Sequence, residues 1–142
     1  MCGICGKLIF SEAGSVEPAL IAKMNSAMTH RGPDDSGVYT SRKIGLGHRR
    51  LSIIDLQTGK QPLSNEDNTV WVVFNGEIYN FRELRNELII RGHTFKTHTD
   101  TEVIVHLYED HGEAFVSKLR GMFAIALWDE TSETLILARD RV

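Results

Sequence analysis

Apolar and polar residues follow one another in short runs along most of the chain, and few stretches keep a helical period. Residues 3–10 mix Ile, Cys, Leu and Phe with two glycines, which favours a buried strand. From Val16 to Met28, apolar residues recur at helical spacing, and Pro18 stands near the first turn, where its missing N–H costs nothing. These patterns predict an interior strand that starts at Cys2, followed by a helix.

A turn-rich segment and several short strands are expected next. Residues 30–37, with the sequence HRGPDDSG, are dense in turn formers and predict an ordered loop. Short strands are predicted in GVYTS, IGLGH and LSIID, which are residues 37–41, 44–48 and 51–55. Within residues 69–80, Asn75 and Gly76 stand between two apolar runs, which is a strong local signal for a tight turn at a strand end.

Two further helices are predicted in the second half of the chain. Residues 81–92 present one apolar face and end at a glycine, Gly92, which is typical of a helix and its C-terminal stop. Thr99 and Glu102 have the spacing of a capping box ahead of an apolar run that ends near Gly112.

The remaining strand patterns decide the fold class. A short strand is predicted at residues 93–97, and residues 122–129 and 134–140 form a closing hairpin. Many short strands in hairpin order, few helices and no regular βαβ alternation predict an α+β fold with antiparallel sheets. Because 142 residues is close to the commonest domain size, one domain is expected over residues 1–142.

The composition is that of an ordinary globular protein and excludes several classes of function. Apolar residues make up 42 % of the chain and charged residues 25 %, which argues against disorder and coiled coil. The net charge is −3 and no basic run occurs, so a nucleic-acid partner is not expected. No apolar stretch approaches the roughly 20 residues of a membrane-spanning helix, and the start lacks a signal-peptide pattern. We therefore expect a cytoplasmic protein with no membrane partner.

The two cysteines, Cys2 and Cys5, are the first candidates for chemistry. In a reducing compartment they could bind metal, cycle between thiol and disulfide, or act as nucleophiles. The six histidines form no His-x-x-x-His pair and no second Cys-x-x-Cys occurs, so no metal site is expected. If Met1 is removed, Cys2 carries a free α-amine with a pKa of roughly 7.7–8.0, which can act as a built-in general base for the thiol. The competing interpretation is that a small second residue only favours Met1 removal.

An ordered set of motifs extends nearly from end to end of the chain. They are MCGICG, HRGPDDSG, GHRRLSIIDL, QPLSN, FNGEIYN, LRNEL, TDTEVI, and LRGMFAIALWD through LARDR. In this order they resemble the N-terminal glutaminase domain of asparagine synthetase, a class II glutamine amidotransferase of the N-terminal nucleophile hydrolase superfamily. The resemblance implies a four-layer αββα sandwich of two antiparallel sheets, and an enzyme that hydrolyses glutamine to glutamate and ammonia.

The resemblance also implies the catalytic residues. Cys2 Sγ would attack the side-chain amide of glutamine and form a glutamyl thioester that water resolves. The side chain of Asn75 and the backbone N–H of Gly76 would stabilise the tetrahedral oxyanion. Without the family resemblance, the Asn-Gly pair predicts only a tight turn. Cys5 would be a small packing residue.

Further residues are assigned to substrate binding by the same resemblance. Arg50, rather than Arg49, would bind the glutamine carboxylate, and Glu77 and Asp100 would meet the ammonium group. The backbone of Ile53 would line the pocket. Read without the family, the two arginines are a solvated surface pair, and Asp100 is a carboxylate in the first turn of a helix. Supporting roles are assigned to three residues of the turn-rich loop: Arg31, Gly32 and Asp34.

The chain departs from the family pattern where the synthetase half would follow. The Ser-Gly-Gly-x-Asp-Ser pyrophosphate loop is absent and the sequence stops at RDRV, so we expect a C-terminally truncated glutaminase domain. No cofactor is expected in this domain, while ATP and magnesium are expected in the missing synthetase domain, which would use the ammonia to make asparagine from aspartate. The expected partners are glutamine and the synthetase domain of the same chain, and a homodimer is left open. A retained Met1 would block the base role of the Cys2 amine.

Several alternatives stay open at this point. The domain could serve another amidotransferase with a different acceptor, although RGPD together with NGEIYN favours asparagine synthetase. A relative of the β-lactam synthetase type would not be expected to keep Cys2. The chain could also be a non-catalytic interaction module of the same fold, or a redox or metal module based on Cys2 and Cys5.

Overall fold

A computed structural model describes residues 2–51 and 59–141. Its strands are β1 (Gly3–Leu8), β2 (Asp35–Thr40), β3 (Ile44–Arg50), β4 (Leu63–Ser64), β5 (Val70–Ile78), β6 (Gly121–Asp129) and β7 (Thr134–Arg139). Its α-helices are α1 (Pro18–Ala27), α2 (Phe81–Ile90) and α3 (Glu102–His111), and a 3-10 helix, η1 (Gly112–Lys118), follows α3. None of the helices in these two ranges is long and apolar enough to cross a membrane.

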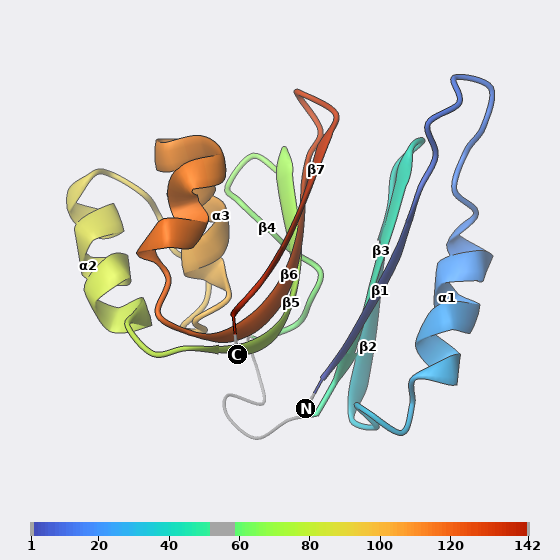
Figure 1. Cartoon of the computed structure of the whole chain (residues 1–142), viewed down its shortest axis with the longest axis horizontal. Helices are drawn as coiled ribbons and strands as arrows, with labels where there is room; N and C mark the ends of the chain where they lie inside the picture. The colour runs from blue at the N-terminus through green and yellow to red at the C-terminus, as the bar shows by residue number, and fades with distance from the viewer. Residues whose placement is uncertain (1, 52–58, 142) are drawn as a thin grey trace.

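The elements stack in four layers, α1, sheet, sheet, and α2 with α3 (Figure 1). One sheet has the strand order β1-β3-β2 and the other β4-β5-β6-β7, and every pairing is antiparallel. The α+β sandwich of two antiparallel sheets between helices is therefore confirmed. The hairpin of β6 and β7 is also as predicted, with Asp129 paired to Thr134 at its closed end.

Two apolar cores hold the layers together. The core between the sheets includes Ile44, Leu46, Val73 and Trp128. The larger core lies between the second sheet and the helices, and it includes Leu88, Ile104, Phe115 and Leu127. Each of these buried side chains is worth roughly 1.5–3 kcal/mol relative to exposure, so packing rather than local propensity fixes how the layers meet.

Helix α1 covers the outer face of the first sheet at unusually short range. A Cβ at Gly45 would lie 2.6 Å from Ile21 Cγ1, and one at Gly47 would lie 2.6 Å from Asn25 Oδ1. The two glycines of β3 therefore let Ile21 and Asn25 of α1 pack directly onto the strand backbone. Asn25 also donates from Nδ2 to the carbonyl of Gly37, at 2.8 Å, which ties the helix to β2.

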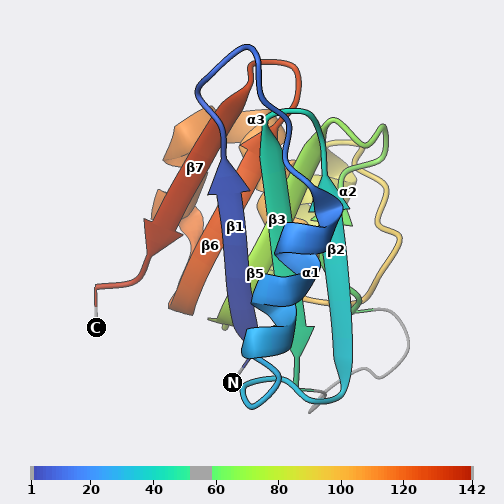
Figure 2. The same cartoon turned by 90° about the vertical axis from the view of Figure 1, so that its right-hand side faces the viewer.

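The first strand lies at an edge, not in the interior as predicted. β3 lies between β1 and β2, so β1 pairs only with β3 among the described strands. β7 is the corresponding edge of the other sheet, and the two edges lie on the same side of the molecule (Figure 2). Cys2 consequently precedes an edge strand, next to the end of β3.

Three of the local predictions differ from the structure. Residues 93–97 form no strand, because Lys96 N and Thr97 N donate to the carboxylate of Glu102 at 2.7 Å each instead of to a neighbouring strand. The same contacts explain why Thr99 is not the N-cap of α3: the Glu102 carboxylate is already engaged upstream, and the N-cap position is Thr101. The turn-rich loop is also shorter than predicted, since β2 begins at Asp35. The strand expected at residues 51–55 falls largely outside the described residues.

Candidate active site

A cavity of about 830 Å³ lies at the end of the sandwich where β1 begins and β3 ends. Six of the residues predicted from the sequence line it: Cys2, Arg50, Asn75, Gly76, Glu77 and Asp100. Antiparallel pairing of Gly3 with Arg49 places Cys2 beside the end of β3. β5 contributes its last residues, and the segment before α3 contributes Asp100. Ile53 lies outside the described residues.

Cys2 lies immediately before β1, and its backbone is held by a hydrogen bond. Its side chain is half-buried, with Sγ 4.0 Å from the carbonyl oxygen of Leu51. The carbonyl of Cys2 accepts a hydrogen bond from Arg31 Nε at 3.2 Å. Arg31 therefore positions the residue that precedes β1 without itself lining the cavity.

The rest of the HRGPD segment is fixed to the end of β3. Arg49 donates from Nε to the carbonyl of Gly32 at 2.7 Å, and Asp34 N donates to the carbonyl of Arg50 at 3.1 Å. Gly32 lies so close to β3 that a Cβ there would be 2.5 Å from the carbonyl carbon of Arg49. Only glycine fits this approach, so the loop and the strand are held as one unit beside the cavity.

The two neighbouring arginines of β3 have different surroundings. Arg49 binds the loop, whereas Arg50 is only 8 % exposed and lines the cavity. Gly59 lies against its guanidinium, since a Cβ there would be 2.6 Å from Nη2. The interpretation as a solvated surface pair is therefore wrong for Arg50, and a buried cation facing a cavity suits an anionic ligand group.

Asn75 and Gly76 lie within β5, and the predicted tight turn is wrong. They pair with Ala124 and Phe123 of β6, so sheet pairing overrides the local turn preference. Gly76 has a φ of +154°, and a Cβ there would lie 2.0 Å from the carbonyl oxygen of Met122. The glycine is required by this close approach to β6.

The two-residue alternation of β5 sets which way Asn75 faces. Val73 packs in the core between the sheets. Since side chains two residues apart share a face, Asn75 and Glu77 point to the same side as Val73, toward the first sheet. This is the side on which Cys2 lies, because Cys2 precedes β1 of that sheet.

Asp100 is anchored to the end of β5 rather than placed within a helix. Its Oδ2 accepts a hydrogen bond from Ile78 N at 2.9 Å, and α3 begins only at Glu102. The interpretation as a first-turn helix carboxylate is therefore wrong. Burial raises the pKa of Asp100 above its usual range, and the nearby charge of Glu77 acts in the same direction. The site thus combines a buried cation, Arg50, with two carboxylates.

Two further polar residues line the cavity and were not predicted from the sequence: the half-buried Gln61 and the buried His48. Gln61 accepts from Phe74 N at 2.7 Å through Oε1 and donates to Thr101 Oγ1 at 3.3 Å, so it joins β5 to the segment that carries Asp100. His48 is 1 % exposed and also lines the cavity. Because residues two apart on a strand share a face, the position of His48 two residues before Arg50 predicts that both side chains point to the cavity.

Burial lowers the pKa of His48 to about 4. An unfolded histidine has a pKa of about 6.5, so the unfolded chain binds more protons between these two values. Folding stability should therefore fall by about 3 kcal/mol through His48 as the pH drops from 6.5 to below 4. Denaturant unfolding at several pH values should show this loss in the native chain and a shallower dependence in His48→Gln. Equal pH dependence in both would contradict the neutral, buried state of His48.

The second cysteine belongs to the packing of α1. Cys5 Sγ donates to Asn25 Oδ1 at 3.3 Å, and burial raises the pKa of its thiol. Residues three apart on a strand face opposite sides, so Cys2 and Cys5 do not form a facing pair. Both are free thiols, and it is their opposite directions that do not favour a redox or metal module built on the pair.

Comparison with known proteins gives consistent matches. A family model described as a glutamine amidotransferase domain matches residues 1–142. The chain is 48 % identical over 144 residues to asparagine synthetase [glutamine-hydrolyzing] 1 of Bacillus subtilis, covering 99 % of this chain and 22 % of that protein. It is 45 % identical over 142 residues to asparagine synthetase [glutamine-hydrolyzing] of Sandersonia aurantiaca, covering 100 % and 27 %. The chain thus spans about a quarter of the length of these curated relatives.

A solved structure shares the fold. Glutamine phosphoribosylpyrophosphate amidotransferase from B. subtilis, solved with ADP and GMP, superposes with a TM-score of 0.74 at 22 % identity, covering 96 % of this chain and 37 % of that one. At this level of identity the match supports the architecture alone, and the site must be argued from its own residues.

Proposed function

Because the chain belongs to the glutamine amidotransferase domain family, we propose that it hydrolyses glutamine to glutamate and ammonia with Cys2 as the nucleophile. The observation that carries the proposal is that Cys2, Asn75, Gly76, Arg50 and Asp100 all line one cavity. A thiol, an amide donor, a buried cation and a carboxylate are the groups that hydrolysis of a zwitterionic amide requires.

The chemistry divides into two half-reactions. The α-amine of Cys2, free once Met1 is removed, takes the thiol proton as Sγ bonds to the amide carbon of glutamine. The tetrahedral intermediate collapses when the C–N bond breaks and the amine returns the proton to the leaving nitrogen, which releases ammonia and leaves a glutamyl thioester. Water then adds to the thioester, and breaking of the C–S bond releases glutamate and restores the thiol.

Charge develops on the amide oxygen in both half-reactions. The Asn75 side chain faces the Cys2 side of β5, and Gly76 follows it in the same strand. Donors fixed by a sheet need no reorganisation as the oxyanion forms, which is the condition for strong electrostatic stabilisation. We assign this role to Asn75 Nδ2 and the backbone N–H of Gly76.

The substrate would be held by its α-carboxylate and α-ammonium groups. Arg50 offers a buried guanidinium for the carboxylate, and Asp100 with Glu77 offers negative charge for the ammonium. Arg31, Gly32 and Asp34 act indirectly, because they fix the loop that supports Cys2 and Arg50.

The relatives suggest where the ammonia goes. Proteins named asparagine synthetase extend well beyond the region that matches this chain. We infer that ammonia passes to a synthetase domain linked in the same polypeptide, which would use ATP and magnesium to make asparagine from aspartate in the cytoplasm. The runner-up is the same glutaminase serving another acceptor.

Asp100→Asn tests the substrate site. The substitution keeps an acceptor for Ile78 N but removes the charge, so the KM for glutamine should rise by about 10- to 100-fold, the range for losing a charge-assisted hydrogen bond. The measurement is glutamate formed at varied glutamine concentration. Asp67→Asn is the matched control, since Asp67 lies in the turn before β5 and bonds to Thr69. No glutamate formation by the processed native chain would contradict the proposed function, and an unchanged KM in Asp100→Asn would contradict the ammonium site.

A further inference from the structure

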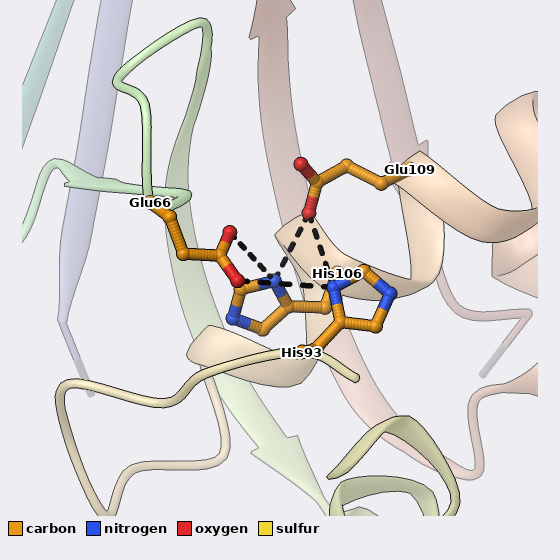
Figure 3. Close-up of side chains that lie close together, drawn as sticks. All are labelled: Glu66, His93, His106 and Glu109. Carbon is orange, nitrogen blue, oxygen red and sulfur yellow. Dashed lines mark hydrogen bonds and ion pairs between the residues drawn. The ribbon is translucent and has the colours of Figure 1, made fainter. Parts of the chain in front are cut away.

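Four side chains outside the cavity converge from three separate segments. Glu66 lies between β4 and β5, His93 follows α2, and His106 and Glu109 lie three residues apart on α3 (Figure 3). One ligand atom from each lies within 4.8 Å of all the others. We propose that these residues form a structural site for a divalent transition metal, with Zn²⁺ as the preferred ion.

The spacing of the ligand atoms fits one metal ion. His106 Nδ1 lies 3.0 Å from Glu109 Oε2 and 3.5 Å from Glu66 Oε2. His93 Nδ1 lies 3.6 Å from the same Glu109 oxygen and 3.9 Å from Oε1, the other oxygen of the Glu66 carboxylate. Bonds of about 2.0–2.1 Å to nitrogen and oxygen in a tetrahedron put neighbouring ligands about 3.3 Å apart. Small side-chain movements would therefore bring the four atoms to ideal positions.

Both histidines are oriented as metal ligands usually are. Each directs Nδ1 into the cluster, while Nε2 of His93 lies 3.1 Å from Asp110 Oδ1 and Nε2 of His106 faces Glu102 Oε1 at 3.7 Å. A carboxylate next to Nε2 favours the histidine tautomer in which Nε2 carries the proton. The lone pair of Nδ1 is then available to the metal. His106 is fully buried, so its ring cannot be satisfied by bulk water.

Each of the two carboxylates also accepts a hydrogen bond through one of its oxygens. Glu109 Oε1 accepts a hydrogen bond from Asn65 Nδ2 at 2.8 Å, which leaves Oε2 toward the histidines. Glu66 Oε1 accepts one from Thr94 N at 3.0 Å, which leaves Oε2 toward His106. Hydrogen-bonded outer partners on Glu66, His93 and Glu109, with the Glu102 carboxylate 3.7 Å behind His106, separate this cluster from a chance gathering of surface acids.

The donor set indicates the class of ion and its role. Two carboxylates balance the charge of a dication, and two imidazoles favour zinc over magnesium or calcium, which prefer oxygen ligands. Four protein ligands leave no open position on a tetrahedral ion, which is typical of a structural site. None of the four residues is among those that line the cavity.

Metal binding would fix the segment that leads to the candidate active site. Glu102, behind His106, binds the backbone of Lys96 and Thr97. Thr97 Oγ1 in turn lies 3.0 Å from Thr99 Oγ1, and Thr99 lines the cavity beside Asp100. The proposed ion thus joins α3, the segment after α2 and the turn before β5.

The test is titration of the 142-residue chain carrying Cys2→Ala, which removes the reactive thiol as a competing ligand. Calorimetry with ZnCl2 should give one site per chain, and Co²⁺ should give the absorption of a tetrahedral nitrogen and oxygen site. His93→Gln and Glu109→Gln should each weaken binding by about 100-fold or more, since loss of an outer partner alone costs roughly 10- to 100-fold. His111→Gln, a histidine of the same helix outside the cluster, should bind as the parent does.

Thermal unfolding gives a second readout. Zn²⁺ should raise the Tm of the parent and of His111→Gln, and it should leave His93→Gln and Glu109→Gln unchanged, because a ligand stabilises only a folded state that binds it. Absence of saturable binding in the parent would overturn the proposal and would leave the cluster as a network of contacts between histidines and carboxylates. Equal binding in all variants would overturn it as well.

Discussion

Replacing Cys2 by alanine is expected to reduce glutamine hydrolysis to background, a loss of roughly 10⁶-fold if it matches the effect of removing a covalent nucleophile in a well-studied hydrolase. No other thiol can take over the attack, because Cys5 packs against Asn25 of α1. The measurement is the rate of glutamate formation at saturating glutamine. Glutamine binding should persist in the variant, since Arg50 and Asp100 are unchanged.

Cys5→Ala is the matched control for this experiment. It removes a thiol of the same strand region but one that only packs, so the glutaminase rate should stay near that of the native chain. Its stability should fall by about 1 kcal/mol, the usual cost of a point substitution. Loss of activity in Cys5→Ala with activity kept in Cys2→Ala would reverse the assignment of the nucleophile.

Asn75→Ala should lower kcat by about 10²- to 10³-fold, the cost of removing one oxyanion donor. The KM for glutamine should change little, because the donor acts on charge that develops only in the transition state. The backbone of β5 supplies the pairing with Ala124, so the fold should survive the substitution. Initial rates over a range of glutamine concentrations separate the two parameters.

Asn86→Ala provides the control for the oxyanion donor. Asn86 is an exposed residue of α2, away from the cavity lining, and its replacement should leave kcat unchanged. An increase in the KM of Asn75→Ala with no change in kcat would contradict the oxyanion role and would indicate a ground-state contact instead.

Much of the architecture could be predicted because it depends on local patterns. The hairpin of β6 and β7 and the helices α1 and α2 each carry a periodic apolar pattern with turn or stop residues at their ends. Two of the predictions that the structure contradicts have tertiary causes. Asn75-Gly76 reads as a turn in isolation, but pairing with β6 extends the strand through it. The strand predicted at residues 93–97 is replaced by backbone contacts with the Glu102 carboxylate.

The site was predictable only where a residue belongs to a motif. Placing Cys2 beside Arg50 needs the antiparallel register of β1 and β3, which no local pattern reveals. His48 and Gln61 line the cavity and belong to the motifs GHRRLSIIDL and QPLSN, but their residue types alone indicate no catalytic or substrate-binding role. The proposed metal site carries no sequence motif, because only His106 and Glu109 among its four residues are close together along the chain. The other two ligands come from distant turns.

The most direct test of the account is labelling of the processed chain with a glutamine-like diazo-ketone, followed by intact mass measurement and peptide mapping. The nucleophile and its pocket predict one adduct per chain, on Cys2, in molecules that have lost Met1, with protection by free glutamine. A folded, processed chain that takes no label, or that is labelled at Cys5 without protection by glutamine, would contradict the claim that Cys2 is the nucleophile of a glutamine site.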